Sequence, residues 1–277
     1  MVEKKQIQRE QLSHNIMRDV ILRIDYLGVI SIDDIVKAFT SNFKGTFKNY
    51  TKTFSNTIDL GNVDIEQISE TLSVPVKELK RQEIHRFSEN TFGTDDVVFD
   101  MCNYYTVLHV KCRDYKNIDP YLNFFVDYVS FLNGINEFTS IKRFGLRKIG
   151  ALVKPDFESL LDNFEPDYFH TKVSNPNFKV AGNQFVDILV SEDLFYNFTY
   201  RRSIDSGFIS NDGKIVPAKQ ALLDIDGYIN ENKLSETKFG IDEDETRASI
   251  RRLNDVYMFE LFKLSMSNNF LNSQIHE

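Results

Sequence analysis

The chain has 277 residues, with 42% hydrophobic and 27% charged side chains, 24 Phe, 12 Tyr and no Trp. These proportions exclude an intrinsically disordered protein, and the aromatic content suffices for a core without metals or disulfides. The net charge of −8 disfavours binding of nucleic acid or anionic membrane by the surface as a whole. No segment approaches the ~18 consecutive apolar residues of a membrane span, and the charged N-terminus predicts no signal peptide. We therefore expect a cytoplasmic protein that does not enter membranes.

The first half of the chain alternates predicted strands with helices. β-Branched residues at 20–26 predict a strand, and Ser31 is the expected N-cap of a helix whose apolar residues recur at helical spacing up to Phe43. Asp119, followed by Pro120, predicts the start of another helix that Gly134 ends. The other elements expected here are strands at 51–60, 82–88, 97–102, 105–112 and 138–153, and a short helix at 63–72.

In the second half, a short helix through Leu161 precedes a run of strands. These strands are expected near 167–173, 178–190, 195–204 and 215–229, with a turn at Asn211-Asp212-Gly213. A long helix from Asp242 to about Met266 follows, and its acidic first turn is favoured by the helix dipole. The expected inner face of this helix consists of five apolar residues: Ile250, Leu253, Tyr257, Leu261 and Leu264.

This order of elements favours an α+β fold with largely antiparallel sheets and a few long helices. The strands come in neighbouring runs, whereas a regularly wound βαβ sheet would alternate strands and helices throughout. The chain divides into an N-terminal half, residues 1–153, and a C-terminal half, residues 154–277, which we expect to pack as one unit. Each half has several strands and a long helix, but no repeat is recognisable at the level of residues.

The most distinctive segment is basic and runs from Lys142 to Lys148. On a strand, Arg143, Gly145 and Arg147 share one face, and two guanidiniums flanking a glycine can hold an anion. Arg201, in the triplet Tyr200-Arg201-Arg202, is a further candidate for such a ligand-binding site. The alternative, which we favour, is that these arginines pair with carboxylates elsewhere in the fold.

Asp224 and Asp226 are the natural partners for the arginines, because they also share one face of a predicted strand. Two carboxylates at this spacing are equally a way to hold a divalent metal ion. A metal site needs a third ligand, and the acids available for it are Asp187, Asp205 and Glu260. Nothing local in the sequence supplies that ligand, so pairing is again the favoured interpretation.

No motif indicates catalysis or a cofactor. The five histidines are scattered, and the glycine-rich signatures of nucleotide binding and the serine-hydrolase elbow are missing from the sequence. Bases at 77–86, at 142–154 and at Arg201-Arg202 could form a basic stripe. This stripe is the one argument for nucleic acid as a partner, and it is weak because no RNA-binding signature accompanies it.

Two short segments, 143–149 and 223–226, follow a long aromatic helix in this order and resemble the motifs of a known family. With a closing helix that ends at 262–266, they resemble a sporadically distributed, uncharacterised bacterial family with the pattern R-x-G-L-R-Y-I-N followed by L-D-x-D. The resemblance covers residues 95–266. The chain departs from the pattern at Lys148 and Gly150, where an aromatic residue and an asparagine are favoured, and at Asn254, where a histidine is expected. The patchy distribution of the family implies mobile or phage-defence genes as the context.

The sequence thus leads to two hypotheses of different classes. The first is a non-enzymatic binding or regulatory protein that acts through a protein partner, with a link to phage defence. The second is a metal-dependent protein that processes nucleic acid or nucleotides, in which Asp224 and Asp226 hold the metal and Arg143 and Arg147 bind phosphate. A third reading, a sensor of anions or small ligands, requires at least one of these guanidiniums to be unpaired.

Overall fold

The computed structural model describes residues 3–12, 16–28, 31–55, 82–113, 115, 117–135, 139–169, 182–211 and 214–275. The helix predicted at 63–72, residues 56–60 of the strand predicted at 51–60, and the turn residues Asp212 and Gly213 lie outside this part of the chain. The structure is α+β, as the order of the elements predicted.

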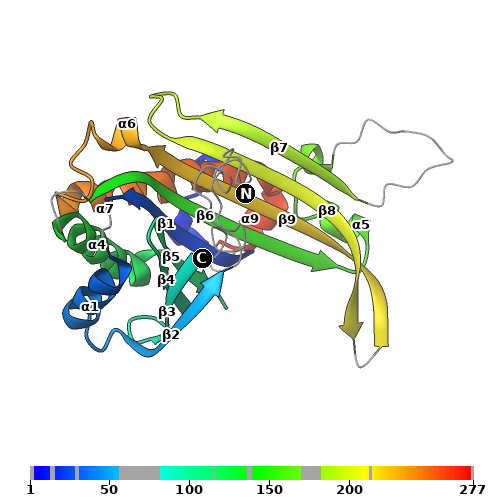
Figure 1. The fold of residues 1–277 in the computed structure, drawn as a ribbon. Helices are drawn as coiled ribbons and strands as arrows, with labels where there is room; N and C mark the ends of the chain where they lie inside the picture. Colours follow the sequence, from blue (N-terminus) through cyan, green and yellow to red (C-terminus); the bar gives the residue numbers. More distant parts are fainter. Residues whose placement is uncertain are drawn as a thin grey trace, which may run out of the picture.

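The described strands form one antiparallel sheet, in which residues of both halves of the chain take part (Figure 1). The order across the sheet is β2-β3-β4-β5-β1-β6-β9-β8-β7, and the halves meet where β6 pairs with β9. The strands are β1 (Met17–Leu27), β2 (Phe47–Ser55), β3 (Gln82–Asn90), β4 (Asp96–Met101), β5 (Tyr105–Lys111), β6 (Ser140–Lys154), β7 (Asn183–Val190), β8 (Asn197–Asn211) and β9 (Lys214–Asn230).

Helices cover one face of the sheet (Figure 1). They are α1 (Ile32–Asn42), α4 (Asp119–Gly134), α5 (Phe157–Leu161), α6 (Glu231–Leu234), α7 (Glu243–Arg251), α8 (Met258–Ser265) and α9 (Asn268–Ser273). Short 3₁₀ turns lie at Lys4–Gln6, Arg9–Gln11 and Pro166–Phe169, and a π-helical segment, η4 (Arg252–Tyr257), joins α7 to α8. As predicted, the Ser31 side chain caps α1 by accepting a hydrogen bond from the backbone N–H of Asp34.

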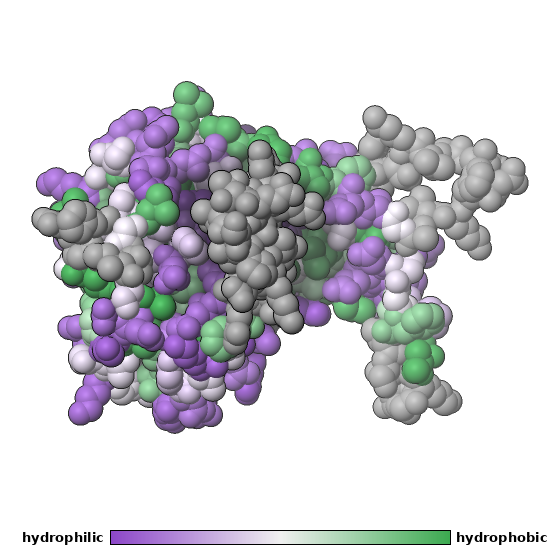
Figure 2. Space-filling model, viewed as in Figure 1, coloured by the Kyte–Doolittle hydropathy of each residue, from purple (hydrophilic) through white to green (hydrophobic). Residues whose placement is uncertain are grey.

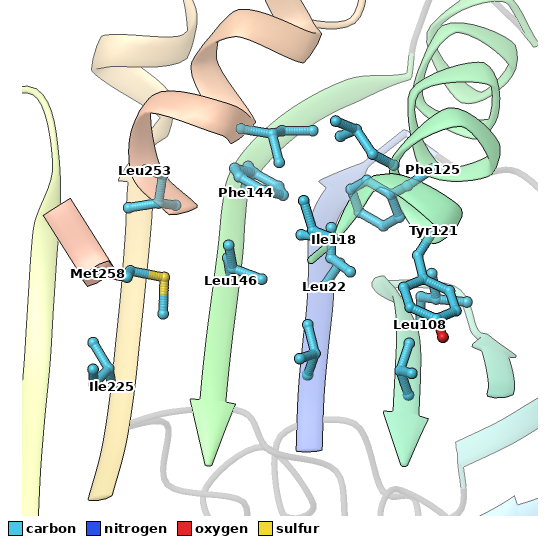
Figure 3. Packing of buried hydrophobic residues seen from close by; sticks show 14 of the residues in the cluster. Leu22, Leu108, Ile118, Tyr121, Phe125, Phe144, Leu146, Ile225, Leu253 and Met258 are labelled. Carbon is cyan, nitrogen blue, oxygen red and sulfur yellow. The ribbon is translucent and has the colours of Figure 1, made fainter. Parts of the chain in front are cut away.

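The core lies between the helices and the sheet. Alternate residues of the central strands point toward the helices, and Figure 3 shows Leu22 of β1, Leu146 of β6 and Ile225 of β9 in one such layer beneath Leu253 and Met258. Aromatic side chains from α1, α4 and the strands fill the space between them, and the ring centre of Phe99 lies 5.2 Å from that of Phe39 and 5.1 Å from that of Phe124. No helix among the described residues is both long and apolar enough to cross a membrane.

Two expectations about secondary structure are wrong. The strand predicted near 167–173 is a 3₁₀ turn over Pro166–Phe169, and 170–173 lie outside the described residues. Proline cannot donate to a strand ladder, which favours the turn. The second error concerns the predicted inner face of the closing helix. Ile250 and Leu253 are buried as predicted, but Leu264 is 64% exposed.

The π-helical segment explains this change of face. A π-helical turn takes more residues than an α-helical turn, so the residues after η4 are rotated relative to the α-helical pattern. The buried residues of the second part of the helix therefore include Met258, Phe262 and Met266. A regular 3.6-residue period could not predict this shift.

Gly227 on β9 permits the close contact between the sheet and the C-terminal helices. A Cβ atom there would lie 2.7 Å from Leu253 Cδ1 and 3.0 Å from Phe198 Cε1. We expect Gly227→Ala to lower the free energy of unfolding by about 1–3 kcal/mol, as overpacking does elsewhere. Urea unfolding measures the effect, with Gly207→Ala as the matched control, because a Cβ at Gly207 meets nothing within 4 Å. Equal stabilities of the two variants would contradict this packing role.

Candidate functional site

The face of the sheet opposite the helices collects charged side chains from β1, β6, β9 and β8. Residues directly opposite one another in an antiparallel pair share a face. Arg147 on β6 lies opposite Asp226 on β9, and Asp224 lies opposite Arg201 on β8. The register therefore brings together the arginines and aspartates that the sequence singled out.

Asp224 is the centre of this cluster. Its carboxylate accepts two hydrogen bonds from Arg147, from Nε at 2.8 Å and from Nη2 at 2.7 Å, and a third from Arg201 Nη1 at 3.2 Å. The Asp224 side chain is 4% exposed, whereas both arginines are more than a third exposed. The bidentate hydrogen bonds to Asp224 raise the pKa of Arg147 above its usual value.

Arg143 lies between two carboxylates on neighbouring strands. Its guanidinium is 3.5 Å from Asp25 on β1 and 3.6 Å from Asp226 on β9, and it stacks 4.5 Å from the centre of the Tyr228 ring. Arg23 completes the row, with its Nε 2.7 Å from the Asp25 carboxylate. Sequence reasoning missed Arg23 and Asp25. The sequence shows that these two residues alternate in a predicted strand, but it does not show that β1 lies beside β6.

Asp226 differs from Asp224 in its environment. Burial raises the pKa of Asp226, and the positive charges of Arg143 and Arg147 oppose that shift without cancelling it. Among the described residues, Asp226 has one ion pair, at 3.6 Å from Arg143, whereas Asp224 accepts three hydrogen bonds. The two acids are thus unequal members of one network.

Gly145 leaves room for a guanidinium from its own strand. A Cβ there would touch the guanidinium of Arg143 at 3.6 Å, which is an ordinary van der Waals distance. The space that the sequence suggested for a ligand is therefore next to Arg143 itself.

The pairing favoured from the sequence is present, because Arg147 and Arg201 bind Asp224 and Arg143 lies near Asp226. Four guanidiniums and three carboxylates make up the cluster of Arg23, Arg143, Arg147, Arg201, Asp25, Asp224 and Asp226. An anion there would compete with carboxylates that already occupy the guanidiniums. Anion binding at Arg143, Gly145, Arg147 and Arg201 stays a prediction.

Metal binding by Asp224 and Asp226 likewise stays a prediction, and the geometry adds an obstacle to it. Two arginines already neutralise Asp224, and a metal ion would have to displace them. Of the candidate third ligands, Asp187 pairs with Arg202 and Glu260 with Lys263, both away from Asp224.

A second group of possible metal ligands lies at the start of α1, where Asp33, Glu83 and His85 place their ligand atoms within 4.8 Å of one another. Lys52 occupies this group, with its ammonium 2.6 Å from Glu83 and 3.6 Å from Asp33. The hydrogen bond from Lys52 lowers the pKa of Glu83. The lysine thus supplies the positive charge that a metal ion would otherwise bring.

Comparisons with protein family models, curated proteins and solved structures found no match to this chain.

Proposed function

We propose that the protein is a non-enzymatic binding protein that acts by contacting another protein through an arm formed by β8 and β9. The arm consists of the described residues among 205–218. The observation that carries this proposal is the set of large apolar side chains that the arm leaves in solvent.

The register of the sheet defines the arm. β7 pairs with β8 only as far as Ile204, and β6 pairs with β9 only as far as Lys219. Beyond these residues, within the described part of the chain, β8 and β9 pair only with each other, up to Asn211 and Lys214. Figure 1 shows this two-stranded ribbon projecting from the rest of the sheet.

One face of the arm is apolar. Phe208 lies opposite Pro217, and Ile215 lies two residues from Pro217 on the same strand, so these three side chains share a face. Phe208 is 74% and Ile215 is 77% exposed. Figure 2 shows hydrophobic residues on the projecting part of the molecule. An apolar surface on a two-stranded ribbon favours a contact that buries it, because isolated ribbons have little stability of their own.

The partner that fits this surface is a different protein with an apolar groove and a neutral or basic rim. Two copies of this chain each carry a net charge of −8 and repel one another, which disfavours self-association. The charged cluster around Asp224 supports a scaffold role rather than catalysis, since its arginines have carboxylate partners. A link to phage defence stays a prediction from the resemblance.

Site-specific photo-crosslinking tests the proposal in the producing cell. A photoreactive residue at position 208 should crosslink to one defined protein. The same residue at Val256, which is 51% exposed on η4, serves as the matched control and should not. The purified pair should then bind with a Kd that rises at least about tenfold on Phe208→Ser, since burial of one Phe side chain contributes ~1.5–3 kcal/mol.

Three outcomes would overturn this function. They are a crosslinking pattern shared by positions 208 and 256, a Kd unaffected by Phe208→Ser, and sedimentation showing a dimer that Phe208→Ser dissociates. The last result would identify a second copy as the occupant of the arm.

A further inference from the structure

Lys148 is a lysine in a row of core residues. It lies on β6, and its neighbours in register are Val20 on β1 and Ile225 on β9, both fully buried. Lys148 itself is 4% exposed. Among the described residues, no hydrogen bond or ion pair engages its amine, which lies 5.0 Å from the centre of the Tyr115 ring. Lysine is rarely buried to this extent without a partner, so this position calls for an explanation.

The amine lines a cavity of about 30 Å³ between β6, the N-terminal segment and the C-terminal helices. Met258, Phe259 and Phe262 supply apolar walls, and Arg9 is the other cationic group that lines it. Arg9 is held by Asp255, with its Nη1 2.9 Å from the carboxylate, and lies 4.9 Å from the centre of the Tyr115 ring. A cavity of this size has room for one or two groups as large as a water molecule.

The charges around the cavity favour a neutral amine. Burial lowers the pKa of Lys148 well below its usual value, the nearby Arg9 lowers it further, and Asp255 and Cys112 act in the opposite direction. If Lys148 were protonated, the one carboxylate of Asp255 would have to balance two buried cations, Arg9 and Lys148. A desolvated lysine beside another cationic group is the environment that activates amines for covalent chemistry.

The adjoining helix is irregular at the same place. Asp255 belongs to the π-helical segment η4, and such segments are frequently found at functional sites. Its neighbour Asn254 is fully buried, and its Oδ1 atom has no hydrogen-bond partner. Unsatisfied buried polar atoms are uncommon, so the segment combines two features with a structural cost.

We propose that Lys148 is a nucleophilic amine that forms an imine with a small carbonyl compound carrying a carboxylate, the class to which 2-oxo acids belong. The carbonyl group enters the cavity beside Lys148, and the carboxylate of the ligand exchanges with the Asp255 carboxylate on Arg9, which lines the same cavity. This inference does not depend on the arm, and it assigns a ligand site separate from the protein-binding surface.

The reaction uses no oxidant or reductant. The lone pair of the neutral amine attacks the carbonyl carbon, and a proton moves from nitrogen to the former carbonyl oxygen to give a carbinolamine. The hydroxyl then leaves as water with the second proton of the nitrogen, and a C=N bond remains. Hydrolysis reverses both steps, so the imine is a reversible form of the ligand complex.

Reductive trapping tests the inference on the full chain. The protein is incubated with glyoxylate and cyanoborohydride at pH 7, where cyanoborohydride supplies the hydride that reduces the imine, and peptide mass spectrometry reports each modified lysine. We expect Lys148 to be carboxymethylated about tenfold faster than Lys154 on the same strand, because a neutral amine is the reactive form. Arg9→Gln should slow the labelling by glyoxylate more than the labelling by acetaldehyde, which has no carboxylate.

Labelling of Lys148 at or below the rate of Lys154 would overturn the proposal, as would labelling that appears only after unfolding in urea. Equal effects of Arg9→Gln on glyoxylate and acetaldehyde would overturn the carboxylate preference. The wild-type chain carries the main comparison, so the result does not depend on the folding of a variant. The outcome is also independent of the crosslinking at Phe208.

Discussion

Asp224→Ala should lower the free energy of unfolding by about 2–3 kcal/mol, because it leaves Arg147 and Arg201 without their shared carboxylate. Truncation of a deeply buried ion-pair partner costs about 3–5 kcal/mol. The expected loss is smaller here, since the two arginines are more than a third exposed and water can solvate them. Urea unfolding monitored by tyrosine fluorescence or circular dichroism measures the change.

Asp226→Ala is the matched control on the same face of the same strand. Its carboxylate makes one longer contact, and burial raises its pKa, so the charged form is already disfavoured in the folded state. We expect a loss of less than about 1 kcal/mol. A double-mutant cycle of Asp224→Ala with Arg147→Ala should show a coupling of about 1–2 kcal/mol. Similar losses for Asp224→Ala and Asp226→Ala would mean that the network is not centred on Asp224.

Lys148→Met should raise the free energy of unfolding at pH 7 by about 1–3 kcal/mol. Methionine keeps the length and apolar stem of the side chain and removes an amine that has no partner among the described residues. Lys154→Met, at the half-exposed end of the same strand, is the control and should change stability by less than about 0.5 kcal/mol. Thermal or urea unfolding distinguishes the two variants.

The same substitution should alter the dependence of stability on pH. The pKa of Lys148 is lowered in the folded state, so between that pKa and ~10.4 the unfolded chain carries a proton that the folded chain lacks. The contribution of Lys148 to stability therefore rises with pH across this window, by up to ~1.4 kcal/mol per unit, and falls as the pH is lowered.

Other groups near the cavity titrate as well, so the difference between wild type and Lys148→Met is the quantity to compare. Burial raises the pKa of both Cys112 and Tyr115 to about 12, and their ionisation in the unfolded chain lowers stability at alkaline pH. Arg9 also lines the cavity and is paired with Asp255. A wild-type minus variant difference that stays constant from pH 7 to 9 would mean that Lys148 is charged in the folded state.

The charged cluster around Asp224 and the cavity at Lys148 lie on different faces of the sheet and have different proposed roles. The cluster around Asp224 joins β6, β9 and β8 by charge pairing, and β8 and β9 continue into the arm whose apolar face we propose as the protein-binding surface. The cavity at Lys148 lies on the opposite, helix-covered face of the sheet. Substitution of Asp224 should therefore lower stability and weaken the attachment of the arm. Reductive trapping at Lys148 reports on separate chemistry.

The sequence by itself determined the fold class and most of the elements. Alternation of apolar residues in β1 and β6, the Ser31 cap and the Asp119-Pro120 helix start are local signals, and each of them predicts its element without knowledge of the rest of the chain. The likeness in spacing between Arg143-Gly145-Arg147 and Asp224-Asp226 also suggested their pairing, because residues two apart on a strand share a face.

Only the tertiary structure decided which strands are neighbours, and the sites depend on that order. Asp25 meets Arg143 because β1 lies beside β6, a contact between residues 118 positions apart. Lys148 belongs to the basic run in the sequence, yet its side chain points to the core, since the period of two along β6 places it with Leu146 and not with Arg147. The π-helical segment is a further example, because the 3.6-residue period predicted from the sequence does not include its extra residue. The order of the strands depends on long-range contacts, which no local propensity encodes, and the inward direction of Lys148 follows once the face of β6 that meets the helices is known.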